Sequence, residues 1–334
     1  MLKSEEVLRQ SQGAMKQWGD TWRKHAVVNK KIMNERGYTN QRIFGHGIGK
    51  KLICVAFGTS LENQVENLKI RNQSVDIACV DKAFGYLIEN GVKPNFVYLA
   101  DAGIDYEKWC KTWIDQTEDI CLFLNVTANP VWAENWKGKL FYYVNQDNIK
   151  TEEIFSPLSG CRELVKASSN VGNSILVHAE TYMYYDEYIL VGYDFCWSDK
   201  NYYCNHDSSK RWYMNHHQIL TQKGTLVNTS QNLLFSARWL MDFIKAILIP
   251  NRKRIYITDE SLLDIPAINL KKVLTEATSR NIPQELIDHV IKNRTQNITV
   301  TPQEGGEKLK EILTTHQVLN VQVQHLPKDL FQEA

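Results

Sequence analysis

The part of the chain that most constrains its fold is the stretch at residues 51–101. Three short apolar runs, at 52–57, 75–80 and 96–100, are separated there by two stretches of helix length. Short apolar runs that alternate with helices are typical of parallel β-strands joined by crossover helices. In such sheets, ligands bind beyond the carboxyl ends of the strands. The residues that follow these three runs are therefore the first candidates for a functional site.

The same alternation continues along the chain and predicts an α/β fold, with a Rossmann-like, mostly parallel sheet and helices on both faces. Further strands are predicted at 120–126, 140–144, 188–192 and 254–257. Helices are predicted at 1–40, 104–117, 168–185 and 231–249. We expect three parts: an N-terminal helical extension at 1–48, a Rossmann-like domain at 49–275 and a C-terminal helical segment at 276–334.

Composition and charge exclude several classes of protein. The 334 residues have a formal net charge of +1, so no basic surface field favours nucleic acid as a partner. No apolar run approaches the ~18 residues that a membrane span needs, and the charged N-terminus lacks the apolar core of a secretory signal. The seven cysteines form no CxxC pair, which argues against a zinc or redox site. We expect a cytoplasmic protein whose terminal helices offer a surface for oligomerisation.

Small polar residues follow the first strand of the 51–101 unit. Gly58, Thr59 and Ser60 stand where that strand turns into a helix. One hypothesis is a backbone cradle at the helix N-terminus, where exposed N–H groups and the helix dipole favour a phosphate. The alternative is a tight turn in which Ser60 caps the helix.

Amide and hydroxyl side chains mark two further element ends. Ser169, Asn170 and Asn173 open a predicted helix and offer N–H groups and amides to a ligand. Asn125 stands at the end of the strand at 120–126. We expect these residues to contribute to nucleotide binding.

Asp81 and Asp101 close the second and third strands of the 51–101 unit. A single carboxylate in such a position can simply cap a helix. Two carboxylates at neighbouring strand ends more often form a site for a divalent metal or for ribose hydroxyls. The residues alone leave both alternatives open.

The segment at 195–217 is rich in Tyr, Trp, His and Asp and has no periodicity, so we predict a long loop over the site. It follows Asp194, which closes a predicted strand. His206, His216 and His217 lie in this segment, and imidazole suits acid/base chemistry because it titrates near neutral pH. His206 and His216 are the leading candidates, and a merely solvated histidine is the alternative.

Two other segments are predicted as loops. Trp132 and Trp136 stand in a Pro- and Gly-flanked stretch and would line a rim or cover the core. The Gly-rich run at 45–50 lacks the preceding strand and the following helix of a Walker phosphate loop. It is predicted to lead into the first strand.

Several segments, taken in order, resemble one family. They are FGTSL at 57–61, VDKA at 80–83, NGVKPN at 90–95, SNV at 169–171, LVGYDF at 190–195 and RWL at 238–240. Their order and spacing are similar to those of the 6-hydroxymethylpterin diphosphokinase MptE-like family, which includes the motility accessory factor (Maf) glycosyltransferases. The chain departs from the family pattern in three places: Thr59 replaces a Pro, Asn95 replaces an Asp, and the pair Ser169-Asn170 replaces Gly-Gly.

The resemblance implies a nucleotide-dependent transferase of one of two kinds. In one branch a diphosphate passes from ATP to a pterin alcohol with magnesium, which Asp81 and Asp101 would hold. The other branch resembles sialyltransferases, which take a nonulosonic acid from a CMP-activated donor. No further cofactor is implied.

By the sialyltransferase likeness, Tyr202 and Tyr203 would bind the donor phosphate, and His206 or His216 would deprotonate the acceptor hydroxyl. We favour this glycosyltransferase interpretation, because a pterin kinase would not need the Tyr- and His-rich segment or the terminal helices. The partners would be a nucleotide or nucleotide-sugar and an acceptor sugar, protein or small alcohol. A catalytically inert binding or assembly module is a third hypothesis, motivated by the three departures from the family pattern.

Overall fold

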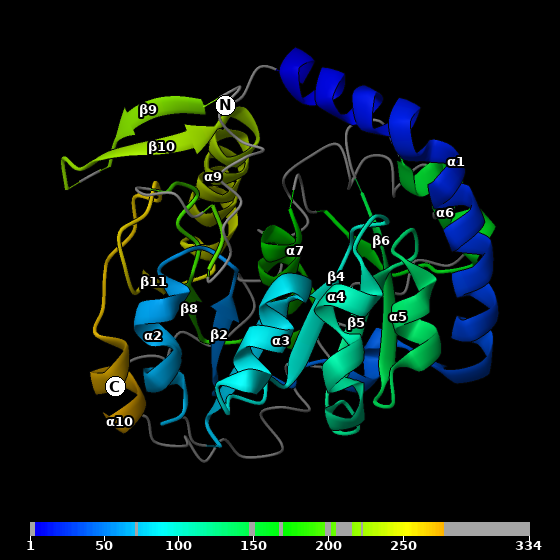
Figure 1. Cartoon of the computed structure of the whole chain (residues 1–334), viewed down its shortest axis with the longest axis horizontal. Coiled ribbons are helices and arrows are strands. Elements are labelled where there is room, and N and C mark those ends of the chain that lie inside the picture. The colour runs from blue at the N-terminus through cyan, green and yellow to red at the C-terminus, as the bar shows by residue number, and fades with distance from the viewer. Residues whose placement is uncertain are drawn as a thin grey trace.

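The structure is a computed structural model that describes residues 4–70, 73–146, 151–166, 170–197, 202–204, 216–221 and 223–276. Its centre is a nine-stranded sheet (Figure 1). The strands are β1 (Gly37–Tyr38), β2 (Lys51–Val55), β3 (Val75–Val80), β4 (Phe96–Leu99), β5 (Cys121–Asn125), β6 (Leu140–Asn145), β7 (Leu164–Val165), β8 (Glu187–Val191) and β11 (Arg254–Ile257). Their order is β1-β6-β5-β4-β3-β2-β8-β11, with β7 beside β6, and all of these pairs are parallel.

Helices cover both faces of this sheet, as predicted (Figure 1). The crossovers from β2 to β6 carry α2 (Leu61–Leu68), α3 (Asp81–Glu89), α4 (Tyr106–Trp109) and α5 (Pro130–Asn135). On the other face lie α7 (Val171–His178), which continues into η3 (Ala179–Met183), and α9 (Gln231–Phe243), which continues into η4 (Ile244–Leu248). The strand order reverses after β6, so right-handed crossovers place these later helices on the opposite face.

The inner strands, β2 to β6 and β8, are buried on both faces along almost their whole length, which explains why they read as continuous apolar runs rather than as alternating ones. All six residues of β3 are buried. The predicted bounds of β3 and β11 agree with the structure, and the other predicted strands are shifted by a residue or two at their ends. Apolar runs thus predicted seven of the nine strands, and the two-residue strands β1 and β7 were missed.

The N-terminal segment forms one long helix, α1 (Ser4–Arg36), as predicted. It runs past α5 and α6 (Thr151–Ser159) at the β6 side of the sheet (Figure 1). Ala26 and Ile32 of this helix are buried in the same core as the sheet residues. Among the described residues, no helix is both long enough and apolar enough to cross a membrane.

The stretch around Trp132 and Trp136 is helical, and its prediction as a loop is wrong. Asn129 caps α5 by accepting the Val131 N–H at 3.2 Å, and Pro130 stands at the first helical position, where a missing N–H costs nothing. Both tryptophans are fully buried, so they belong to the core. The helix predicted at 104–117 is in fact two short pieces, α4 and the 3₁₀ turn η2 (Lys111–Gln116).

Part of the segment predicted as a loop over the site is a β-strand. His216 and His217 begin β9 (His216–Leu220), which pairs antiparallel with β10 (Leu226–Ser230) in a separate hairpin (Figure 1). Thr229 lies opposite His217 in this pairing. Reciprocal backbone bonds between Trp197 and Asn228, both of 2.8 Å, join the hairpin to the chain that follows β8.

The last described element is α10 (Leu270–Glu276), which lies beside α2. Apart from residue 276, the C-terminal helical segment predicted at 276–334 lies outside the described residues. A 3₁₀ turn, η1 (Asn40–Ile43), and the turns at 44–49 lead from α1 into β2, as the sequence predicted for the Gly-rich run.

Candidate functional site

The carboxyl ends of the strands form one edge of the sheet, called here the carboxyl edge. The chain leaves β2 in one direction to build β3 to β6 and later adds β8 on the other side of β2. The boundary between β2 and β8 is the topological switch point of the sheet, where α/β proteins bind their ligands. The residues that follow β2 and β8 are therefore candidates for the ligand-binding site.

The turns after β2 and β8 are in direct contact. The Gly58 N–H donates to the Gly192 carbonyl at 3.0 Å. A Cβ atom on Gly58 would lie 2.5 Å from that carbonyl oxygen and 2.6 Å from Asp194 Oδ2. Only a glycine lets the two turns approach this closely.

Asp194 lies over the start of α2 and binds the turn predicted as a phosphate cradle. Its Oδ2 accepts the Ser60 N–H at 2.9 Å and the Thr59 hydroxyl at 3.3 Å, and its Oδ1 accepts the Ser60 hydroxyl. Burial raises the pKa of the Asp194 carboxyl to about 6, although the bonds from Ser60 oppose that rise. The structure thus brings Gly58, Thr59, Ser60 and Asp194 together. The Ser60 side chain does not cap α2, because its hydroxyl is bonded to Asp194 instead.

Beyond β3 and β4, Asp81, Lys82, Asp101 and Tyr203 form a second group, the Lys82 cluster. The Lys82 ammonium lies 3.3 Å from the Tyr203 hydroxyl and 4.5 Å from the centre of its ring. Despite burial, the Tyr203 hydroxyl and the carboxylates of Asp81 and Asp101 raise the pKa of Lys82. The ammonium is therefore charged at neutral pH.

The two aspartates of this cluster have different surroundings. Asp81 is the first residue of α3 and is buried, and burial raises the pKa of its carboxyl to about 7. Asp101 is exposed, and its Oδ1 accepts the Gly103 N–H at 2.7 Å. The two aspartates follow the neighbouring strands β3 and β4, and the negative charge of Asp101 contributes to the raised pKa of Asp81. Their role as site residues stays a prediction.

Aromatic packing fixes the short described piece of the 195–217 segment, residues 202–204. Tyr203 stacks on Phe57, with ring centres 5.9 Å apart, and the Cys204 N–H donates to the Phe57 carbonyl at 3.1 Å. Tyr202 is buried and packs against Trp197 at 4.8 Å. Of the two predicted phosphate-binding tyrosines, Tyr203 is therefore the one in the Lys82 cluster.

The predicted amide residues have local partners. Asn125 is buried, and its Oδ1 accepts the N–H and the hydroxyl of Thr127 at 3.1 and 3.0 Å. Asn170 caps α7 by accepting the Asn173 N–H at 2.8 Å, and the Asn173 amide donates to the Ser236 carbonyl at 3.3 Å. These bonds hold turns and helix ends in place, and the role of these residues in ligand binding stays a prediction.

Three of the predicted residues cannot be placed in the site. Ser169 and His206 lie outside the described residues. His216 begins β9, opposite Ser230 of the hairpin. A catalytic role for either histidine stays a prediction.

The helix α1 contributes residues whose contacts the sequence did not predict. A Cβ atom on Gly103 would lie 2.8 Å from the Trp18 ring and 3.5 Å from Asp101 Oδ1, so Trp18 and Asp101 flank the same turn. The buried Asn29 amide donates to the carbonyls of Val126 and Ala128 at 2.9 and 3.0 Å. The loops after β4 and β5 are therefore both in contact with α1.

Comparisons with known proteins give a match to a family and matches to solved structures. The profile of the family described as 6-hydroxymethylpterin diphosphokinase MptE-like matches residues 26–200. The chain belongs to the MptE-like family.

The fold of this MptE-like chain is similar to that of MAf glycosyltransferase from Magnetospirillum magneticum AMB-1, with a TM-score of 0.59 and 14% identity. The match covers 92% of this chain and 44% of that protein, so the chain spans less than half of its length. At this identity the likeness shows a shared fold. No curated protein sequence matches the chain.

Magnesium is the cofactor that one branch of the MptE-like family implies. Asp81 and Asp101 are the carboxylates that would hold it, but the Lys82 ammonium interacts with both of them. Within the described residues, no group of three or more His, Cys, Asp or Glu side chains could hold a metal. The donor set does not fit a magnesium centre made by the protein alone.

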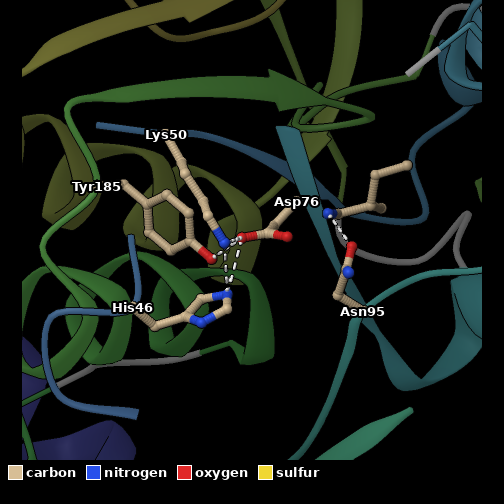
Figure 2. Close-up of polar contacts among 6 residues, drawn as sticks. His46, Lys50, Asp76, Asn95 and Tyr185 are labelled. Carbon is tan, nitrogen blue, oxygen red and sulfur yellow. Dashed lines mark hydrogen bonds and ion pairs between the residues drawn. The ribbon is translucent and has the colours of Figure 1, made fainter. Parts of the chain in front are cut away.

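The opposite, amino edge of the sheet carries a polar network that fixes the starts of β2 and β3 (Figure 2). Asp76 Oδ2 accepts the Tyr185 hydroxyl at 2.7 Å and lies 3.0 Å from His46 Nε2 and 3.5 Å from Lys50 Nζ. Nearby, Asn95 Oδ1 accepts the Ile77 N–H at 2.9 Å. The departure from the family pattern at Asn95 is therefore at the edge remote from the candidate site.

A pocket of about 360 Å³ also lies at the amino edge. Glu187 lies in its wall and bonds Lys51 at 2.8 Å and Arg254 at 3.1 Å. Lys51 and Arg254 are thus already paired with Glu187. The pocket also lies at the opposite edge of the sheet from the carboxyl ends of the strands, where proteins of this fold class bind ligands.

Proposed function

We propose that this chain is a nucleotide-dependent transferase whose site lies at the carboxyl ends of β2, β3 and β4. The observation that carries the proposal is the Lys82 cluster, which brings a cation, two carboxylates and a tyrosine hydroxyl together at the carboxyl edge of the sheet. Membership of the MptE-like family supports a transferase, and the glycosyltransferase name of the structural neighbour supports sugar transfer.

In the proposed reaction, the acceptor hydroxyl oxygen bonds to the anomeric carbon while the bond from that carbon to the donor phosphate oxygen breaks. The phosphate leaves on the nucleotide with the bonding electrons, and the hydroxyl proton passes to a base. Asp101 is our candidate for the base, since it is an exposed carboxylate beside the cluster. His206 is the alternative base.

The donor that we propose is a CMP-activated nonulosonic acid. Such a donor leaves as a nucleoside monophosphate, so the site must bind one phosphate group and not a chain of three. Tyr203 meets this need, because its hydroxyl lies beside the only ammonium group of the Lys82 cluster.

The departures from the family pattern do not argue for an inert module. Thr59 donates a hydrogen bond to Asp194, and Asn170 caps α7. Asn95 lies at the amino edge and bonds the backbone of β3. Each of these three residues therefore has a structural partner, and none of them removes a group from the Lys82 cluster.

A melting-temperature panel tests the proposal. CMP, CDP, UDP, GDP, ADP and ATP are added separately, with magnesium or with EDTA. A ligand at about 100 times its Kd adds about 2.7 kcal/mol to the free energy of unfolding, which raises the melting temperature measurably. Stabilisation by CMP in EDTA supports the CMP-sugar transferase. Stabilisation by ATP that requires magnesium supports the diphosphokinase, and no stabilisation by any nucleotide supports the inert module.

Asp101→Asn provides the catalytic test once a donor is known. We expect a loss of transfer rate of about 10²- to 10⁴-fold, the usual contribution of a general base. The melting temperature should be unchanged because Asp101 is exposed. Asp119→Asn is the matched control, since Asp119 is an exposed aspartate that pairs with Lys93 at 3.1 Å. Equal transfer rates for the two variants would remove Asp101 from the mechanism.

A further inference from the structure

Lys82 is the one residue of its cluster whose charge suits an anionic ligand. It is the second residue of α3 and follows the buried Asp81. An ammonium group has three N–H donors. In the part of the chain that the structure describes, the Tyr203 hydroxyl is its single hydrogen-bond acceptor, at 3.3 Å. Two donors are therefore left for a ligand.

The charges around Lys82 show why a phosphate needs it. A donor phosphate placed beside Tyr203 would lie near the carboxyl groups of Asp81 and Asp101, and negative charges close together repel one another. Some cation must offset that repulsion. Lys82 interacts electrostatically with both carboxylates and with Tyr203, so it already lies where that cation is required.

The position of Lys82 is also well fixed. Its ammonium lies 4.5 Å from the centre of the Tyr203 ring, and that ring is stacked on Phe57. Phe57 itself lies two residues beyond β2 and packs edge-on against Trp109, with ring centres 5.7 Å apart. An ammonium held in this way loses little further side-chain freedom when a ligand binds, which favours affinity.

We infer that Lys82 binds the phosphate of the donor and, together with the Tyr203 hydroxyl, stabilises the phosphate as it leaves. The inference rests on the proposed function, because it names the residue that recognises the charged part of the proposed substrate. It also predicts that phosphate binding at this edge does not depend on a divalent metal.

The test measures binding of inorganic pyrophosphate, CMP and cytidine by calorimetry, in EDTA and again with magnesium. Lys82→Gln removes the charge and keeps a side chain of similar length, whereas Lys82→Arg keeps the charge. Lys93→Gln is the matched control, since Lys93 is an exposed lysine paired with Asp119. Melting temperatures show that each variant is folded.

We expect Lys82→Gln to weaken pyrophosphate and CMP binding in EDTA by about 10- to 100-fold, the range for hydrogen bonds to a charged group. Cytidine binding should be unchanged, because cytidine has no phosphate. Lys82→Arg should retain most of the affinity, and Lys93→Gln all of it.

Three results would overturn the inference: equal pyrophosphate binding by Lys82→Gln and the parent chain, no pyrophosphate binding by the parent chain at about 10 mM, or binding that requires magnesium. A different result separates this inference from the proposed function. If pyrophosphate binds through Lys82 but no nucleotide binds at all, the phosphate site stands and the nucleotide-dependent transferase does not.

Discussion

Gly58 shows how a single residue fixes the geometry of the switch point. Its N–H bonds to Gly192, and its missing side chain leaves room for the Asp194 carboxylate over the start of α2. Neither contact is with a chain neighbour. The sequence therefore predicted a turn at Gly58 and a polar group at Asp194, but not that the two would meet.

We expect Gly58→Ala to lower the free energy of unfolding by about 1–3 kcal/mol, the usual cost of overpacking. The added methyl group would lie 2.5 Å from the Gly192 carbonyl oxygen, so the two turns must separate. Urea denaturation measures the loss. Gly13→Ala is the control, since nothing lies within 4 Å of its added methyl group and alanine favours the helix. Equal stability of the two variants would contradict this account of the turn.

Lys82 illustrates what residue patterns miss. Asp81 and Asp101 were predictable as site residues because they follow apolar strands. Lys82 looks like an ordinary residue of a helix surface. Its importance depends on Tyr203, 121 positions further along the chain, and on the path that brings that residue back over β2. Spacing along the sequence carries no signal for such a contact.

At the scale of elements, α1 makes contacts that the sequence did not reveal. The sequence predicted its length but treated it as an extension. In the structure its Asn29 amide bonds two carbonyls of the loop after β5, and its Trp18 lies against the turn that carries Asp101. The helix is therefore part of the wall of the candidate site.

We expect Asn29→Ala to lower the free energy of unfolding by about 1–3 kcal/mol, because two buried carbonyls would lose their donor. Asn29→Asp should cost more, since a carboxylate would face the carbonyl oxygens of Val126 and Ala128. Urea denaturation again gives the comparison. If Asn29→Asp were as stable as the parent chain, the clamp between α1 and the β5 loop would not exist in solution.

The elements that were predicted well are those with long apolar runs. β3 was obtained to the residue because all six of its positions are buried, which leaves room for little but apolar side chains. The β9–β10 hairpin was missed because its strands are mixed in character: Leu220 and Leu226 are exposed while Thr229 is buried. α5 was missed because proline and glycine at its ends read as a loop.

For the molecule as a whole, buried carboxyls predict an unusual dependence of stability on pH. Burial raises the pKa of Asp81 to about 7 and that of Asp194 to about 6. An unfolded aspartate titrates near ~3.9, so both groups bind protons more tightly in the folded chain. The free energy of unfolding should fall as the pH rises from about 4 to 7.

Asp76 acts in the opposite direction. Burial opposes its ionisation, but the bonds and charges of His46 and Lys50, with the bond from Tyr185, lower its pKa overall. Its contribution to stability is present above ~3.9 and is lost as the pH falls through its lower folded value.

We therefore expect a melting temperature that is highest near pH 4 and lower at both ends of the range, about pH 2 and pH 8. Asp81→Asn should reduce the decrease in melting temperature at pH values above the maximum. Asp76→Asn should remove the decrease in melting temperature at pH values below it. Calorimetric scans across this range give the curves. A melting temperature that rises from about pH 5 to pH 8 would contradict the raised pKa values.

The pairing of β2 with β8 also sets the order in which the molecule can form. β2 joins β3 through a short local crossover, but its other neighbour lies 136 residues further along the chain, as the Lys51–Glu187 bond shows. Contacts between distant segments form late, because the intervening chain must first be brought together. During synthesis, the strands from β2 to β6 have emerged before β8 exists. Asp194 and Tyr203 emerge after the other residues of the candidate site, so we expect the site to be complete only once β8 has paired with β2.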